Sequence, residues 1–370
     1  MKIAFFINTP AQLHFYKNII ETLETHNHKV IVLVRDYGET LQVANGIKKA
    51  FFVYSKAPND KLGKILSLPK DVYKAYKLLK KFKPDIVTGF GVYDAYTAAL
   101  LKKPCIVFND SEPRVNSVTY SIQFKTFIPL IDAIITPASF QDNLGEKQIK
   151  VRSYKELAYL HPYYFKPNAD ILDELNVKEN EDFVLLRFNA FDAVHDAGIK
   201  GFSLNEKMQL IKALEQYAKI FVVSENNLTS DFDKYILKIP KYKIHDALYF
   251  AKLLVSDTQT MTTEAAILGT PAVRCNTFVG PNDMSNFIEL ENTYGMIFNY
   301  DNASEAISKA VELIKQPDLK MKWRDKRVVL LKEKINIPEF MVWFFENYPQ
   351  SLNEMKNNPN YQNIFLEISA

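Results

Sequence analysis

The chain has 370 residues, which is too long for one compact hydrophobic core and suits two domains. Its composition, 47% hydrophobic and 24% charged, is that of a folded globular protein and excludes a disordered chain. A formal net charge of +3 is too small to indicate a nucleic-acid-binding protein, so we expect no nucleic-acid partner.

The first 150 residues alternate short apolar runs with helical patterns, which is typical of βαβ units around a parallel sheet. Strands of such a sheet are buried on both faces, so they are continuously apolar. The predicted strands are Lys2–Ile7, Lys29–Val34, Ala50–Tyr54, Asp85–Thr88, Cys105–Phe108 and Ala133–Thr136, and the predicted helices are Gln12–Thr25, Pro69–Lys81, Asp94–Leu101 and Val118–Leu130. We therefore predict an N-terminal Rossmann-like domain over residues 1–150.

The pattern breaks at Gly145–Asn180, a stretch with several prolines, and residues 151–180 are predicted to connect two domains. A second α/β series follows, with strands Phe183–Phe188, Ile220–Ser224, Leu253–Ser256, Pro271–Cys275 and Met296–Phe298, and helices Leu204–Tyr217, His245–Ala251, Thr260–Leu268, Ser304–Lys315 and Leu319–Glu333. We predict a C-terminal Rossmann-like domain over residues 181–335. A helix and tail, residues 336–370, are expected to pack back on the N-terminal domain. Because open α/β sheets bind ligands at the carboxyl ends of their strands, the two domains should face each other across a ligand cleft.

Cysteine usage and hydropathy indicate a cytoplasmic protein. Cys105 and Cys275 lie in predicted buried strands, and no Cys/His spacing predicts a disulfide framework or a metal site. The apolar start ends at Asn8 without a cleavage motif, and no stretch is long enough for a transmembrane helix. Any membrane contact would be peripheral, at the inner face.

The segment from Leu253 to Arg274 is the most informative part of the chain. It reads as strand, hydroxyl-rich turn, short helix, Gly-Thr-Pro stop and next strand. A helix that starts directly after a strand presents unpaired N–H groups and the positive end of its dipole, which suits a diphosphate. The turn and the helix start supply the predicted phosphate contacts, namely Ser256, Thr258, Gln259, Thr260, Met261 and Thr262. Glu264 lies one helical turn after Thr260, where its carboxylate could accept hydrogen bonds from two ribose hydroxyls.

The simpler interpretation of this segment is structural. Serine and threonine commonly cap helices, and a glutamate commonly complements the helix dipole. Four hydroxyl residues and a carboxylate between two buried strands exceed what capping requires. We therefore favour the nucleotide-binding interpretation.

Four motifs of this chain resemble a known family. Besides Thr260–Pro271, they are Asn8–Phe15 (NTPAQLHF), Lys155–Pro162 (KELAYLHP) and Lys243–Leu248 (KIHDAL). They are similar to the domain of unknown function 354 family, DUF354, which is grouped with GT-B glycosyltransferases and UDP-GlcNAc 2-epimerases. The resemblance covers the chain to about residue 345 and implies the α/β fold of GT-B type. It places Glu264 at the ribose and the Lys243–Asp246 loop, which contains Ile244 and His245, beside the base.

The chain departs from the superfamily at one point of this segment. The superfamily turn often carries paired glycines where this chain has Thr258-Gln259. Side-chain contacts to phosphate are therefore expected to replace close backbone approach.

Candidate catalytic residues follow two strands of the N-terminal domain. His14 comes after the first strand, and its near-neutral intrinsic pKa suits a base that removes a proton from an acceptor hydroxyl. Asp110 and Glu112 follow the strand Cys105–Phe108 and could serve as the base instead. Both interpretations have structural alternatives, a local hydrogen bond for His14 and a loop paired with Arg114 for the two carboxylates.

Further candidates belong to the C-terminal domain. Arg187 could neutralise the diphosphate without a metal, and Asp192, His195 and Asp196 could orient it or the sugar. Glu225 ends a strand and could contact the donor sugar. Asp231-Phe232-Asp233 matches the DxD pattern of metal-dependent sugar transferases only at chance level, so we expect neither a metal nor another cofactor.

The stretch Lys61–Lys83 is rich in lysine and aliphatic residues. It could lie on an anionic membrane surface to reach a lipid-linked acceptor. We prefer the alternative, an amphipathic helix that covers the sheet and exposes its lysines to water.

Together these features predict a metal-independent glycosyltransferase of cell-surface polysaccharide biosynthesis. It would transfer a sugar from a nucleotide-sugar, with UDP as the expected nucleotide, to a glycan or lipid-linked acceptor. A non-hydrolysing UDP-GlcNAc 2-epimerase and a non-catalytic nucleotide-sugar-binding protein remain the alternatives.

Overall fold

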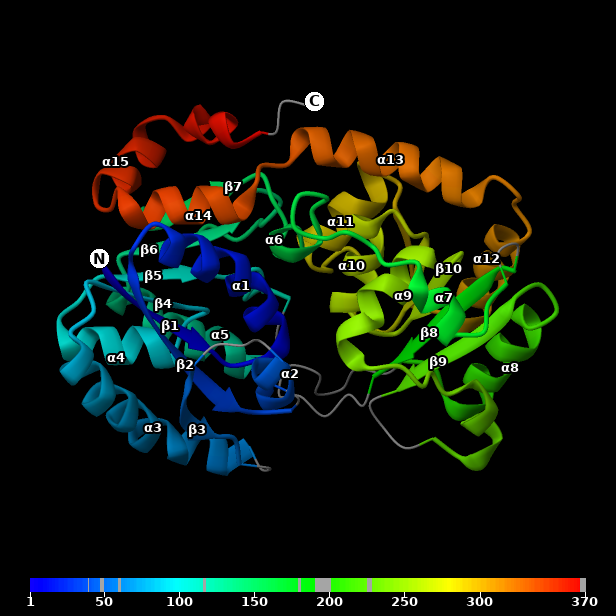
Figure 1. Cartoon of the computed structure of the whole chain (residues 1–370), viewed down its shortest axis with the longest axis horizontal. Helices are drawn as coiled ribbons and strands as arrows, with labels where there is room; N and C mark the ends of the chain where they lie inside the picture. Colours follow the sequence, from blue (N-terminus) through cyan, green and yellow to red (C-terminus); the bar gives the residue numbers. More distant parts are fainter. Residues whose placement is uncertain are drawn as a thin grey trace. The chain divides into compact units, whose positions relative to one another are not determined.

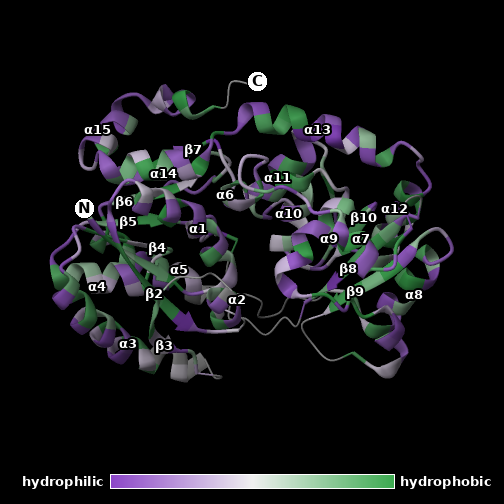
Figure 2. Cartoon of the chain, in the orientation of Figure 1, coloured by the Kyte–Doolittle hydropathy of each residue, from purple (hydrophilic) through white to green (hydrophobic). Residues whose placement is uncertain are grey.

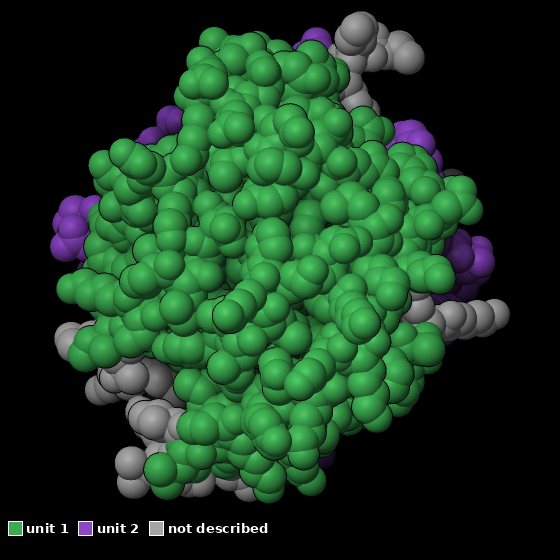
Figure 3. All heavy atoms as spheres, turned by 90° about the vertical axis from the view of Figure 1, so that its left-hand side faces the viewer, with its two compact units in different colours: residues 1–159, 333–370 green, residues 160–332 purple. Residues whose placement is uncertain are grey.

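A computed structural model describes residues 1–38, 40–46, 50–58, 61–115, 118–178, 181–189, 201–224 and 228–366. The chain forms two compact units (Figures 1 and 3). Unit 1 comprises residues 1–159 and 333–370, and unit 2 comprises residues 160–332. The change of unit at Tyr159/Leu160 falls inside the stretch 151–180 that was predicted to connect two domains.

Unit 1 is built on a seven-stranded parallel sheet with the order β3-β2-β1-β4-β5-β6-β7. Its strands are β1 (Lys2–Ile7), β2 (Lys29–Asp36), β3 (Phe52–Lys56), β4 (Ile86–Gly89), β5 (Cys105–Phe108), β6 (Ala133–Pro137) and β7 (Gln148–Val151). Its helices are α1 (Pro10–Thr25), α2 (Thr40–Gly46), α3 (Lys61–Phe82), α4 (Tyr93–Leu101), α5 (Val118–Phe127), η1 (Ile128–Leu130), α14 (Ile337–Glu346), α15 (Gln350–Asn357) and η5 (Pro359–Phe365), with α6 (Leu157–Leu160) at the change of unit. The first six strands follow the order of a Rossmann sheet.

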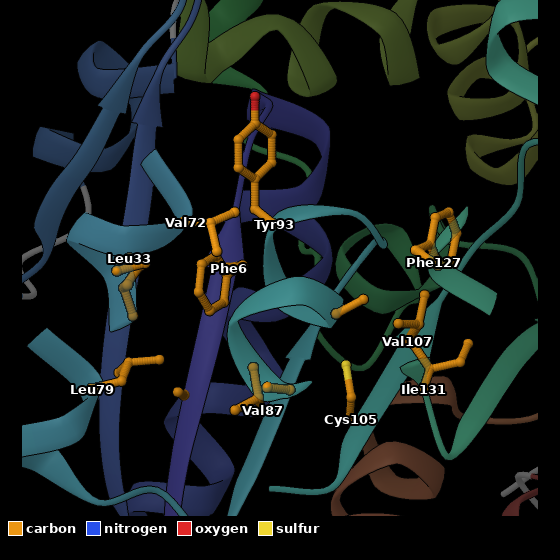
Figure 4. Packing of buried hydrophobic residues seen from close by; sticks show 14 of the residues in the cluster. Phe6, Leu33, Val72, Leu79, Val87, Tyr93, Cys105, Val107, Phe127 and Ile131 are labelled. Atoms are coloured by element: carbon orange, nitrogen blue, oxygen red, sulfur yellow. The ribbon is translucent and has the colours of Figure 1, made fainter. Parts of the chain in front are cut away.

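Alternate side chains of β1 enter two different layers of unit 1. Ala4 and Phe6 belong to a buried cluster with residues of α3, α4 and α5 (Figure 4). Phe5 points to the opposite face, where its ring contacts Phe345 of α14 at 6.0 Å between centroids. This period of two, with apolar residues on both faces, explains why the strand is continuously apolar in sequence.

The C-terminal segment belongs to unit 1 because it completes the layer beside α1. Glu346 of α14 accepts from both His26 and His28, at 2.7 and 2.8 Å. Further along, the side chain of Gln362 accepts from the backbone N–H of Arg152 at 2.8 Å.

Unit 2 contains a five-stranded parallel sheet with the order β12-β11-β10-β8-β9. Its strands are β8 (Phe183–Phe188), β9 (Lys219–Ser224), β10 (Leu253–Ser256), β11 (Ala272–Cys275) and β12 (Ile297–Tyr300). Its helices are α7 (Asp170–Glu174), α8 (Leu204–Leu214), η3 (Ser230–Tyr235), η4 (Lys241–Lys243), α9 (Ile244–Phe250), α10 (Thr260–Leu268), α11 (Ser285–Asn292), α12 (Ala303–Ile314) and α13 (Leu319–Glu333). The strand order reverses between β8 and β10, which makes their carboxyl ends the topological switch point of this sheet.

Several helices of both units are amphipathic and alternate hydrophilic with hydrophobic residues in Figure 2. In α12, Ala306, Ala310, Leu313 and Ile314 form the buried stripe. Within the described residues, no helix is both long and apolar enough to span a lipid bilayer.

Helices α2, α7 and α11 were not predicted from the sequence, and two further elements differ from the sequence-based prediction. Helix α3 begins at Lys61 and contains Pro69 in its interior, whereas the prediction took this proline as the helix start. Strand β7 was missed because it lies at the sheet edge. Its burial alternates along Gln148–Val151, so it lacks the apolar run of a central strand.

Candidate functional site

The β10–α10 turn lies at the switch point of the unit 2 sheet. Ser256 ends β10 and is paired with Arg187 near the end of β8. Helix α10 starts at Thr260, and no side chain caps its first turn. Gln259, Thr260 and Met261 are half-buried, while the rest of the helix is buried. The open end of α10 therefore presents backbone N–H groups where a parallel sheet binds its ligand.

The hydroxyls predicted as phosphate contacts are largely hydrogen-bonded inside the turn. The Ser256 and Thr258 hydroxyl oxygens lie 2.7 Å apart, and Ser256 Oγ accepts from the Thr258 N–H at 2.8 Å. Thr262 donates its hydroxyl to the Thr258 carbonyl oxygen at 2.7 Å. These side chains shape the turn. Phosphate contact by these three side chains stays a prediction, and Thr260 and the first backbone N–H groups of α10 are the other candidate donors.

Glu264 and His245 form a buried pair between α10 and α9. Glu264 Oε1 lies 3.0 Å from His245 Nε2, and the two residues are 6% and 8% exposed. Ile244 begins α9 beside this pair and is half-buried. The structure thus brings together the residues that the family resemblance places at the ribose and the base. Glu264 also supports the packing of two helices, which the sequence did not indicate.

Asp257 is a residue of this turn that the sequence interpretation passed over. The residue is 1% exposed, and its Oδ1 accepts from the Asn189 N–H at 2.7 Å. Burial raises the pKa of Asp257 to about 7, although the Asn189 hydrogen bond and the cations Lys207 and Arg187 act in the opposite direction. An aspartate directly after a buried strand, at the switch point, is the signal that could have identified it.

Arg187 stands beside this turn, because its carbonyl oxygen accepts from the Asp257 N–H at 3.2 Å. It is half-buried near the end of β8. Of the other candidates in this unit, Asp192, His195, Asp196 and Glu225 lie outside the described residues.

His14 lies in the second turn of α1 and not at its start, because Thr9 caps the helix and Pro10 begins it. It is half-buried, and its ring lies 5.2 Å from that of Tyr159. Asn18, one turn further, donates to the Ala158 carbonyl oxygen at 2.7 Å. The first two family-like motifs, around His14 and Tyr159, therefore meet in unit 1.

Asp110 and Glu112 occupy different environments despite their close spacing. Asp110 binds Lys155 of the second motif, at 2.6 Å between Oδ2 and Nζ. Burial lowers the pKa of Lys155, but Asp110 and Glu156 outweigh it and the net shift is upward. Glu112 is 1% exposed and accepts from the Gln141 N–H at 2.6 Å, with an Arg114 nitrogen at 3.6 Å. Glu112 thus fastens a loop, which makes Asp110 the better candidate for a base.

No group of three or more His, Cys, Asp or Glu in the described part of the chain is placed to hold a metal ion. Asp231 and Asp233 of the DxD-like triplet are both exposed and lie on the short helix η3.

The lysine-rich stretch forms α3, which packs Val72, Ala75 and Leu79 into the core of unit 1. A groove of about 510 Å³ runs between α3 and the edge strand β3; it is lined by Phe52, Val53, Tyr54, Lys74, Lys77, Leu78, Lys80 and Lys81. The packing agrees with a helix that covers the sheet. Membrane contact by Lys61–Lys83 remains a prediction.

Solved structures of nucleotide-sugar enzymes share this fold. MnaA of S. aureus in complex with UDP matches with a TM-score of 0.68 and 14% identity, over 95% of this chain and 98% of that chain. UDP-GlcNAc 2-epimerase of Neisseria meningitidis, bound to UDP-GlcNAc, matches with 0.66 and 16%, over 96% and 100%. The glycosyltransferase SsfS6 of Streptomyces sp. SF2575 matches with 0.59 and 12%, over 94% and 100%. At these identities the likeness establishes the fold, and the predicted GT-B type is confirmed.

No curated protein matches the chain in sequence. A family model does match, over residues 1–335. This range contains all four motifs on which the resemblance was based. The chain belongs to the family described as "Protein of unknown function (DUF354)".

Proposed function

We propose that the chain is a glycosyltransferase whose unit 2 binds a UDP-sugar at the β10–α10 turn. The observation that carries the proposal is the open N-terminus of α10 at the switch point, with Arg187 on the neighbouring strand. Backbone N–H groups at a helix start and a guanidinium are the donors that stabilise a diphosphate leaving group. Glu264, with His245 beside it, would select the ribose.

In the transfer step, an acceptor hydroxyl oxygen forms a bond to the anomeric carbon of the sugar. The bond from that carbon to the phosphate oxygen breaks, and the nucleoside diphosphate leaves with the electron pair. The helix N–H groups and Arg187 stabilise the charge that develops on the phosphate. His14 of unit 1 accepts the acceptor proton, with Asp110 as the second candidate for this role. No metal is required for these steps.

The proposed acceptor is a glycan or lipid-linked precursor of a cell-surface polysaccharide, and the proposed location is the cytoplasm. The positive charge of the lysines of α3 supports a membrane contact, because it would attract an anionic membrane surface. Vesicle flotation with and without anionic lipid measures this contact separately from catalysis.

A 2-epimerase is the second candidate, because structures of UDP-GlcNAc 2-epimerases share the fold, including that from Neisseria meningitidis at a TM-score of 0.66. An epimerase needs no acceptor. Product analysis of UDP-N-acetylglucosamine incubated with the purified protein alone separates the two. Unchanged sugar stereochemistry together with UDP binding supports the transferase, and accumulation of the C2 epimer supports the epimerase. A thermal-shift screen over UDP-, GDP-, dTDP- and CMP-sugars tests the choice of nucleotide, since a ligand of the folded state raises its melting temperature.

A further inference from the structure

A buried carboxyl stands where unit 2 is proposed to receive a diphosphate. Asp257 directly follows β10, and its N–H donates to the Arg187 carbonyl oxygen at 3.2 Å. Asn276, after β11, donates its amide to the Asp257 carbonyl oxygen at 3.0 Å. Asp257 is therefore fixed at the carboxyl ends of three neighbouring strands.

The two carboxyl oxygens of Asp257 have different surroundings. Oδ1 accepts from the Asn189 N–H at 2.7 Å. Oδ2 is buried and has no hydrogen-bond partner among the residues that the structure describes. It packs against Gly201, where an added Cβ would lie 2.3 Å from it. The carboxyl thus contacts Asn189, just after β8, and Gly201, just before α8. A side chain at position 201 would occupy the space that Oδ2 fills.

An unpartnered, buried carboxyl oxygen favours the protonated acid over the carboxylate. Among the described residues, the charged or titratable groups that face Asp257 are Arg187 of β8, Lys207 of α8 and Cys275 of β11. Neither cation forms an ion pair with the carboxyl within the described residues, and burial outweighs their attraction, so the pKa of Asp257 is about 7. Asp257 therefore changes its charge within the physiological pH range.

A bound diphosphate would alter this balance in one direction. Its negative charge at the α10 start disfavours a carboxylate at Asp257, since like charges close together raise a carboxyl pKa. An ionised Asp257 would also compete with the phosphates for the positive charge of Arg187 and Lys207. Binding of the anion and protonation of Asp257 are consequently expected to support each other.

We propose that Asp257 takes up a proton from solvent when unit 2 binds a nucleotide diphosphate, so that it acts as a proton-linked positioning residue of the β10–α10 turn. The carboxylate oxygen gains the proton, no other bond changes, and release of the nucleotide returns the proton. The inference rests on the proposed function, because it requires the diphosphate to bind at this turn. It assigns pH sensitivity to donor binding and release.

The test is a calorimetric titration with UDP-N-acetylglucosamine between pH 6 and pH 8.5. This probe is preferred to UDP, whose terminal phosphate itself titrates near pH 6. For the wild type, the dissociation constant should rise by up to about 30-fold across this range, the limit for a group that ionises near pH 7 and must be neutral in the complex. Asp257→Asn, which keeps the shape and an acceptor for Asn189 but cannot ionise, should bind with nearly constant affinity. Asp182→Asn is the matched control. It removes a partly exposed carboxylate that binds Lys252 and directly precedes β8, at the end of the strand away from Asp257, and it should retain the wild-type pH dependence.

A second measurement keeps the test decisive if Asp257→Asn does not fold. Titrations of the wild type at pH 7.5 in buffers of different ionisation enthalpy count the protons taken up, and about three quarters of a proton per nucleotide is expected. Pronounced binding without proton uptake, or an unchanged pH dependence in Asp257→Asn, overturns the role of Asp257 and leaves the donor site standing. Absence of binding at every pH contradicts the donor site itself, and the proton linkage with it.

Discussion

Replacing Glu264 separates the two roles that the structure gives to this residue. Glu264 is 6% exposed, and its Oε1 lies 3.0 Å from His245 Nε2. Glu264→Ala removes the proposed acceptor of the ribose hydroxyls and also leaves the buried His245 ring without this partner. A hydrogen bond to a charged group contributes about 1.5–3 kcal/mol. UDP affinity should therefore fall by roughly 10- to 150-fold, and the free energy of unfolding should fall by about 1–3 kcal/mol.

Glu264→Gln is the matched control, because it keeps a carbonyl oxygen for His245 while it removes the charge. Its stability should stay closer to the wild type than that of the alanine variant, and its UDP affinity should lie between the two. Calorimetric titration with UDP measures affinity, and urea unfolding measures stability. A folded Glu264→Ala protein with unchanged UDP affinity would contradict the assignment of Glu264 to the ribose and leave it as a packing residue of α10.

Three further substitutions test the separate parts of the account. His14→Ala should lower turnover by about two to four orders of magnitude with little change in UDP affinity; a near-normal rate in a product assay moves the base to Asp110. Burial raises the pKa of Asp257 from 3.8, its value without burial, to about 7 in the folded protein, so the free energy of unfolding should fall as pH rises from about 4 to about 7. Asp257→Asn should remove that slope and be more stable than the wild type at pH 8 by up to roughly 4 kcal/mol. The same change in the free energy of unfolding between pH 5 and pH 8 for both proteins, measured by urea unfolding, would contradict this. Asp283→Ala leaves the fully buried Arg274 without its carboxylate partner and should cost about 3–5 kcal/mol in the same assay, whereas a loss below about 1 kcal/mol would show that Arg274 is adequately satisfied by its other contacts.

The fold was largely predictable because central parallel strands are buried on both faces. Residues 3–7 of β1 are all apolar for this reason, and the predicted bounds of the strand, Lys2–Ile7, coincide with the observed ones. Edge strands lack this signal. Gln148–Val151 alternates buried and more exposed positions, and in a strand this short the alternation cannot be told from the pattern of a loop.

The local structure of the candidate site was predictable from the sequence, but its side-chain contacts were less so. A hydroxyl-rich turn between a strand and a helix correctly indicated the β10–α10 turn, because that arrangement follows from local sequence. Which partner each hydroxyl binds depends on geometry, and Ser256 with Thr258 turned out to stabilise the turn itself. Glu264 and His245 lie 19 positions apart on two different helices, and spacing rules within one helix do not predict such a pair.

A crystal structure of the protein with UDP tests the central claim most directly. We expect the diphosphate oxygens to accept hydrogen bonds from the first N–H groups of α10 and from Arg187, and the ribose hydroxyls to donate to Glu264. UDP bound at any other place, with the β10–α10 turn empty at saturating ligand, would contradict the donor site and the glycosyltransferase proposal that depends on it.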